Sequence, residues 1–129
     1  MIQVLLDTHA FLWAVTGDPK LPKRTQLLLA SFENEVFVSA ASVWEITTKF
    51  RLGKLPGAQG LAGDIAGSVE RLGFHALAIS LEHAERAGRL PGPHRDPFDR
   101  MLIAQSQAEN LPLVSNEELF DSFSIERIW

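Results

Sequence analysis

Short apolar runs alternate with longer segments of helical spacing along the whole chain of 129 residues. Runs rich in Val, Ile, Leu and Phe predict buried strands at residues 2–6, 36–39, 75–79 and 113–115, with a shorter run at 125–129. Apolar residues that recur every three or four positions predict helices at 8–15, 22–32, 41–52, 61–72, 81–87 and 98–109. Alternating strands and helices are typical of a parallel sheet covered on both faces. We therefore expect an α/β fold, a three-layer sandwich around a mainly parallel sheet of four to five strands.

No repeat, linker or low-complexity tract interrupts this pattern. The length suits a single hydrophobic core. We therefore expect one domain spanning residues 1–129.

The composition is that of an ordinary globular protein, with 46% hydrophobic and 22% charged residues. The chain has no cysteine, which excludes disulfides and cysteine-based zinc sites and fits a reducing compartment. No apolar run approaches the ~20 residues of a membrane helix. The first apolar run has no basic flank and no cleavage site of small residues. We therefore expect a cytoplasmic protein without a signal peptide or membrane span.

Four acidic residues follow predicted strands or begin the helix that feeds one. Asp7 ends the first strand, Glu45 lies in the helix after the second, and Glu117 lies two residues after the fourth. Ligands of open α/β sheets bind at the carboxyl ends of the strands, so these three belong to one edge. Asp99 is in the first turn of the helix before the fourth strand. It joins them only if the loop at 88–95 carries the chain back over that edge.

Each acid also has a purely structural interpretation. Asp7 is a good N-cap for the following helix, and Glu45 has Lys49 four residues on, which suits a solvated ion pair. Asp96 is a natural N-cap for the helix at 98–109, and Ser115 and Glu118 have the spacing of a capping box. Independent caps, however, have no reason to converge on one sheet edge.

Carboxylates that share a partly buried cleft repel one another, so they take up protons or bind cations. Ligand sets made only of oxygen suit hard ions such as Mg²⁺ or Mn²⁺. Such ions generate hydroxide from water, orient a phosphodiester and stabilise its leaving oxygen. The acids together therefore favour metal-dependent phosphodiester chemistry.

The chain resembles the PIN-domain family, in particular the VapC-type toxins of bacterial toxin–antitoxin pairs. The matching segments follow the family's order and span nearly the whole chain, at residues 5–13, 38–46, 94–105 and 113–117. The resemblance implies an α/β sandwich, Mg²⁺- or Mn²⁺-dependent cleavage of RNA, and inhibition by a small antitoxin protein. Homodimers are common in such a family. The unusually apolar first two helices suggest a surface for a partner.

Carried over position by position, Asp7, Glu45 and Asp99 resemble the family's first three acids. The fourth acid is usually Asp, and here Glu117 takes that place, with Asp96 as a substitute. Two hydroxyl side chains resemble supporting groups of the first and fourth acids, those of Thr8 and Ser115.

The net charge of −4 has the wrong sign for a general nucleic-acid footprint, so any contact with RNA must be local. Arg95 and Arg100 flank Asp99 and are the expected RNA contacts.

Two other classes compete with the nuclease. A receiver domain would need a phosphoacceptor Asp after the third strand and a Lys after the fifth, but no Lys follows Lys54. A haloacid-dehalogenase-type phosphatase would need a second Asp at the place of His9. A catalytically weak PIN-like module that only binds a metal or a partner remains the alternative, because Glu117 departs from the family pattern.

Overall fold

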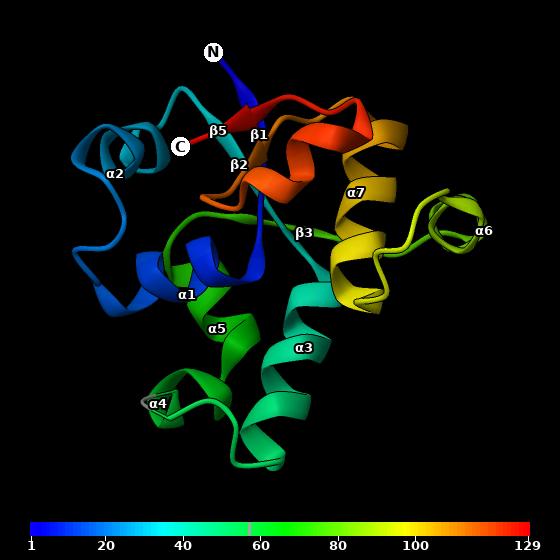
Figure 1. Cartoon of the computed structure of the whole chain (residues 1–129). Coiled ribbons are helices and arrows are strands. Elements are labelled where there is room, and N and C mark those ends of the chain that lie inside the picture. Colours follow the sequence, from blue (N-terminus) through cyan, green and yellow to red (C-terminus); the bar gives the residue numbers. More distant parts are fainter. Residues whose placement is uncertain (57) are drawn as a thin grey trace.

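The computed structural model describes residues 1–56 and 58–129 of the chain (Figure 1). The strands are β1 (Gln3–Leu6), β2 (Glu35–Ser39), β3 (His75–Leu77), β4 (Leu113–Val114) and β5 (Arg127–Ile128). The helices are α1 (Thr8–Thr16), α2 (Lys23–Ala30), α3 (Ala40–Arg51), α4 (Gln59–Ala62), α5 (Ile65–Arg71), α6 (Leu81–Arg89) and α7 (Pro97–Glu109), with a 3₁₀ helix, η1, at Glu118–Phe123.

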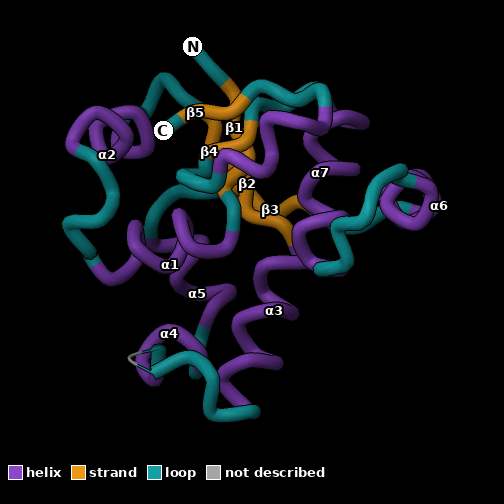
Figure 2. The backbone as a smooth tube through the Cα atoms, viewed as in Figure 1, coloured by secondary structure: helices purple, strands orange, loops and turns teal. Residues whose placement is uncertain are grey.

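The five strands, orange in Figure 2, form one sheet in the order β3-β2-β1-β4-β5. All four neighbouring pairs are parallel. The central strand β1 reads Gln-Val-Leu-Leu, and three of its four residues are buried. A strand covered on both faces needs such a continuous apolar run, which explains why it does not alternate with polar residues. The expected parallel sheet is confirmed.

Successive residues of β1 point into two separate cores. Val4 and Leu6 pack in a cluster with residues of α1, α2, α3, α4 and α5. Leu5 packs on the other face with residues of α7 and η1. Because side chains of a strand alternate between faces, this division shows one helical layer on each side of the sheet. The expected three-layer sandwich is confirmed.

The segment predicted as a single helix at 61–72 is two helices, so that prediction was wrong. Asp64 separates them: it is the N-cap of α5, and its Oδ1 accepts a hydrogen bond of 3.0 Å from the amide of Gly67. A side chain that satisfies a free amide at a helix start favours a new helix over continuation of the old one. The apolar spacing continues across the break and conceals it.

The carboxyl ends of β2, β1 and β4 lie side by side and lead directly to site residues. Asp7 follows β1, Ser39 ends β2 and caps α3, and Ser115 follows β4. The chain after α6 returns so that α7 begins beside the first turns of α3, as Figure 1 shows. In residues 1–56 and 58–129, no helix has the length and apolar character needed to span a bilayer.

Candidate active site

Asp7 is the N-cap of α1 and is almost fully buried, with 4% of its surface exposed. Its Oδ1 accepts a hydrogen bond of 2.7 Å from the amide of Ala10. Burial raises the pKa of Asp7 above its ordinary value, although hydrogen bonds from Ser115 and Ala10 oppose the rise. The nearby charge of Glu117 raises it further. Asp7 thus caps its helix, and the charge of Glu117, the fourth predicted acid, acts on it.

Glu45 lies in the second turn of α3 and is buried, and both of its carboxylate oxygens have protein partners. Thr8 donates a hydrogen bond of 2.6 Å to Oε1, and the Thr8 hydroxyl also lies 3.0 Å from that of Ser42. Lys49, one turn further along the same helix, forms an ion pair with Oε2. Thr8 follows Asp7 directly, so its hydroxyl connects the start of α1 to the Glu45 carboxylate.

Asp99 lies in the first turn of α7, where burial raises the pKa of its carboxyl from 3.8 to about 6. The neighbouring charge of Asp96 adds to the rise, as do those of Glu117 and Glu45. The ring of His94 opposes it, with Nε2 lying 3.0 Å from Oδ2 of Asp99. The charges of the other acids therefore act on Asp99, because the loop after α6 brings the start of α7 back to this edge.

Asp96 and Glu117 have more structural surroundings. Asp96 is the N-cap of α7, and its Oδ1 accepts hydrogen bonds from the amides of Phe98 at 2.9 Å and Asp99 at 3.0 Å. Glu117 is half-buried, and its amide donates a hydrogen bond of 3.0 Å to the hydroxyl of Ser115. The fully buried Ser115 thus contacts both Asp7 and Glu117, the acids after β1 and β4.

The acids interact through space without forming a ready-made ligand nest. Within residues 1–56 and 58–129, no three acidic or histidine side chains lie close enough together to hold one metal ion as they stand. Each central carboxylate instead contacts protein groups: Asp7 contacts Ser115, Glu45 contacts Lys49, and Asp99 contacts His94. The set still fits a hard divalent cation, because its donors are carboxylate oxygens, and burial together with neighbouring acids raises the pKa of Asp7 and that of Asp99. Ion binding would need these side chains to move closer together than they lie here.

Arg100 is committed to the protein backbone. Its guanidinium donates hydrogen bonds to the carbonyl oxygens of Ala87, Leu90 and His94, with distances between 2.6 and 3.1 Å. It thereby joins the end of α6 and the following loop to α7. Of the two arginines expected to contact RNA, Arg95 is the one with an exposed side chain.

Two residues at the site were not among the expected site residues. Lys49 was interpreted only as the partner of a solvated helix pair, yet it is paired with the buried Glu45. Burial lowers the pKa of Lys49, but the hydrogen bond with Glu45 and the charges of Glu45, Asp96 and Asp99 raise it overall. His94 was interpreted as a polar loop residue. Its position five residues before Asp99 was the only sequence signal for their contact.

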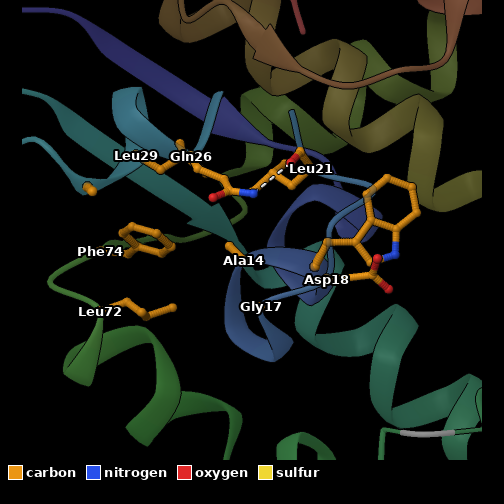
Figure 3. Close-up of a pocket in the computed structure, with 10 residues that line it drawn as sticks. Ala14, Gly17, Asp18, Leu21, Gln26, Leu29, Leu72 and Phe74 are labelled. Carbon is orange, nitrogen blue, oxygen red and sulfur yellow. Dashed lines mark hydrogen bonds between the residues drawn. The ribbon is translucent and has the colours of Figure 1, made fainter. Parts of the chain in front are cut away.

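A separate apolar cavity lies between α1, α2 and the chain that leads into β3 (Figure 3). Leu21, Leu29, Leu72 and Phe74 contribute to its lining, and Gln26 uses its amide to donate a 2.8 Å hydrogen bond to the carbonyl of Leu21. None of the candidate acids lines this cavity.

Comparison with known proteins places the chain in a clear context. The family model described as "PIN domain" matches residues 4–125. The curated ribonuclease VapC16 of Mycobacterium tuberculosis is 37% identical over 65 residues, which is 50% of this chain and 45% of that protein. The chain thus aligns with less than half of the length of this relative.

Solved structures with the same fold cover nearly the whole chain. VapBC2 from Rickettsia felis, solved bound to a DNA fragment from its promoter, has a TM-score of 0.72 at 19% identity, covering 99% of this chain and 98% of that one. VapC20 of Mycobacterium tuberculosis, a toxin that cleaves the sarcin-ricin loop, has a TM-score of 0.60 at 19% identity, covering 95% of each chain. At such identities the likeness establishes the fold.

Proposed function

The chain belongs to the PIN-domain family, and from this premise we propose that it is a divalent-metal-dependent endoribonuclease, the toxin of a toxin–antitoxin pair. The observation that supports this most is the mutual electrostatic influence of Asp7, Glu45, Asp99 and Glu117, four acids from distant parts of the chain. Such an arrangement is destabilising by itself and becomes favourable when a cation joins it.

In this proposal Asp7, Glu45 and Asp99 hold a Mg²⁺ or Mn²⁺ ion, and Glu117 is the fourth acid. The ion, when bound, activates the attacking water and polarises the scissile phosphate. Thr8 and Ser115 orient the carboxylates, since each hydroxyl contacts one of these acids. We assign the contact with the RNA backbone to Arg95, whose side chain is exposed. The products are two RNA fragments, formed by addition of water across a phosphodiester bond.

The comparisons support two partners besides RNA, an antitoxin protein and a second copy of this chain. Structures of VapBC toxin–antitoxin complexes share this fold, so we propose a small antitoxin protein as the inhibitor of this chain. We place its contact at the apolar cavity between α1 and α2, which matches the apolar surface expected from these helices. We also propose that residues 1–129 form a single domain that works as a homodimer in the cytoplasm.

Asp7→Asn tests the activity. Asn is as good an N-cap as Asp, so the variant keeps its helix start and loses one charge. We expect Mn²⁺-dependent RNA cleavage to fall more than ~100-fold, beyond the ~10–100-fold that loss of a metal-orienting partner costs. The measurement is single-turnover cleavage of a labelled RNA with Mn²⁺ and with excess EDTA.

Asp64→Asn is the matched control, because Asp64 caps α5 in the same way and is not among the proposed metal ligands. This variant should retain the wild-type rate. Equal activity of wild type and Asp7→Asn, or full activity in EDTA, would reject the nuclease.

The second candidate is a PIN-like module that binds a partner without cleaving RNA. It is favoured by the lack of a three-ligand nest among residues 1–56 and 58–129, and by Glu at the position of the usual fourth Asp. Purified wild-type protein that binds an antitoxin and cleaves no RNA at any Mn²⁺ concentration would support this candidate instead.

A further inference from the structure

The Glu45 carboxylate is paired with a cation from its own helix. Lys49 lies one turn after Glu45 on α3, and its ammonium is paired with Oε2. Only 6% of the Glu45 side chain is exposed, whereas 35% of the Lys49 side chain is. The pair is therefore buried on the acid's side and open to solvent on the lysine's side.

Lys49 also lies within the field of the site. The charges of Asp96 and Asp99, from the start of α7, act on it together with that of Glu45. An ordinary surface pair between residues four apart is worth little and involves one acid. Here the ammonium is paired with Glu45 of α3, and the charges of Asp96 and Asp99 at the start of α7 also act on it.

The Lys49 ammonium and a divalent ion would compete for Oε2 of Glu45, because two cations that both approach one oxygen closely repel each other. Oε1 of Glu45 already accepts a hydrogen bond from Thr8 at 2.6 Å, so that oxygen is partly satisfied. An ion that binds Glu45 therefore has to displace Lys49. The flexible stem of lysine and its exposed side allow the ammonium to turn toward solvent.

The anion that a displaced Lys49 ammonium would bind is a phosphate of the RNA. Cleavage requires an RNA phosphate to approach a cluster of acids, and a lysine is a common point-charge partner of phosphate. We propose that Lys49 is a switching cation, which neutralises Glu45 until a divalent ion takes over that carboxylate and then binds the RNA phosphate. This inference rests on the proposed nuclease function and extends it by a substrate-positioning residue.

Two lysine variants separate this role from general charge effects. Lys49→Met removes the cation, and Lys54→Met removes the same charge from an exposed lysine five residues further along. Mn²⁺ affinity is measured by calorimetry, and RNA affinity is measured with Ca²⁺ and with no divalent ion. Melting curves verify that each variant is folded, and Lys49→Arg retains the charge.

We expect Lys49→Met to bind Mn²⁺ at least ~5-fold more tightly than wild type, a factor at the low end of usual coupling between sites. The same variant should bind RNA more weakly with Ca²⁺ present, and as wild type does without a divalent ion. In Mn²⁺-saturated cleavage its KM should rise more than its kcat falls. Lys49→Arg should restore much of the RNA affinity, and Lys54→Met should match wild type.

The outcomes distinguish this inference from the proposed function. If wild type binds Mn²⁺ and cleaves RNA while Lys49→Met matches Lys54→Met in both affinities, Lys49 is only a helix-pair partner. Weaker Mn²⁺ binding by Lys49→Met would equally overturn the competition. A wild type that neither binds Mn²⁺ nor cleaves RNA would remove the nuclease and this inference together.

Discussion

Burial, and next the charge of Asp96, raise the pKa of Asp99 from 3.8 to about 6. The folded protein therefore holds the Asp99 proton more tightly than the unfolded chain does. The resulting stability is complete below pH 3.8 and is lost as the pH rises through about 6. Neutral pH thus keeps this carboxylate charged at the expense of stability.

We expect the metal-free protein to lose roughly 2 kcal/mol of unfolding free energy between pH 4 and 7, after allowance for partial exposure of Asp99. Asp99→Asn should lack much of this loss, because it has no proton to release. Urea denaturation in EDTA across this pH range measures it. With saturating Mn²⁺ the trend should reverse, since the ion requires the ionised carboxylate. Identical pH profiles for wild type and variant would contradict the assignment.

At the scale of elements, the placement of α7 depends on one arginine. Arg100 joins α7 to the carbonyls of Ala87 and Leu90 at the end of α6, and to that of His94 in the loop. His94 in turn contacts Asp99. The loop that positions this acid is therefore fixed from the helix that carries it.

Arg100→Lys should destabilise the protein by roughly 1.5–3 kcal/mol, because a lysine has no planar fork and leaves some of these carbonyls without a donor. Its KM for RNA should stay near the wild-type value, whereas Arg95→Met should raise KM with little change in stability. Chemical denaturation and steady-state cleavage measure the two effects. The opposite pattern, a higher KM and unchanged stability for Arg100→Lys, would restore Arg100 as an RNA contact.

Most elements of the fold follow from local pattern, because continuous apolar runs and helical spacing determine the parallel strands and their covering helices. The start of α7 was also readable, because Asp96 was expected as its N-cap and is the N-cap in the structure. The break at Asp64 was not readable, since the apolar spacing runs through it. The 3₁₀ helix η1 was missed because its six residues are too few to establish a helical repeat, although Phe120 and Phe123 have i,i+3 spacing.

The site was predictable as far as strand ends determine it. Asp7 lies at the end of a central strand, so its place follows from topology alone. Asp99 depended on the course of the loop after α6, which a tertiary contact of Arg100 controls and no local pattern reveals. The pairing of Lys49 with a buried acid was equally hidden. A lysine four residues after a glutamate is expected in a solvated pair and in a buried pair alike.

At the scale of the whole molecule, the net negative charge of the protein repels a negatively charged substrate such as RNA. The chain has 16 acidic and 12 basic residues, and acids gather at the edge where we propose that RNA is cut. RNA is attracted to such an edge only after cations have locally reversed the negative charge of the edge. In the proposed mechanism, bound divalent ions and the ammonium of Lys49 supply this positive charge, together with Arg95.

The proposed metal site exists only in the folded protein, since the unfolded chain disperses the acids. An ion that binds only the folded state stabilises it by about 2.7 kcal/mol at a concentration 100 times its Kd. For a domain of this size, that corresponds to a rise in Tm on the order of 10 °C. We expect Mn²⁺ to raise the Tm of wild type in this way, and Asp7→Asn to show much less of the increase. Scanning calorimetry with Mn²⁺, and with K⁺ at matched ionic strength, separates specific binding from screening. Equal shifts with the two salts would mean that the acids are merely screened, and the case for a metal site would fail on thermodynamic grounds, whatever the rate of RNA cleavage.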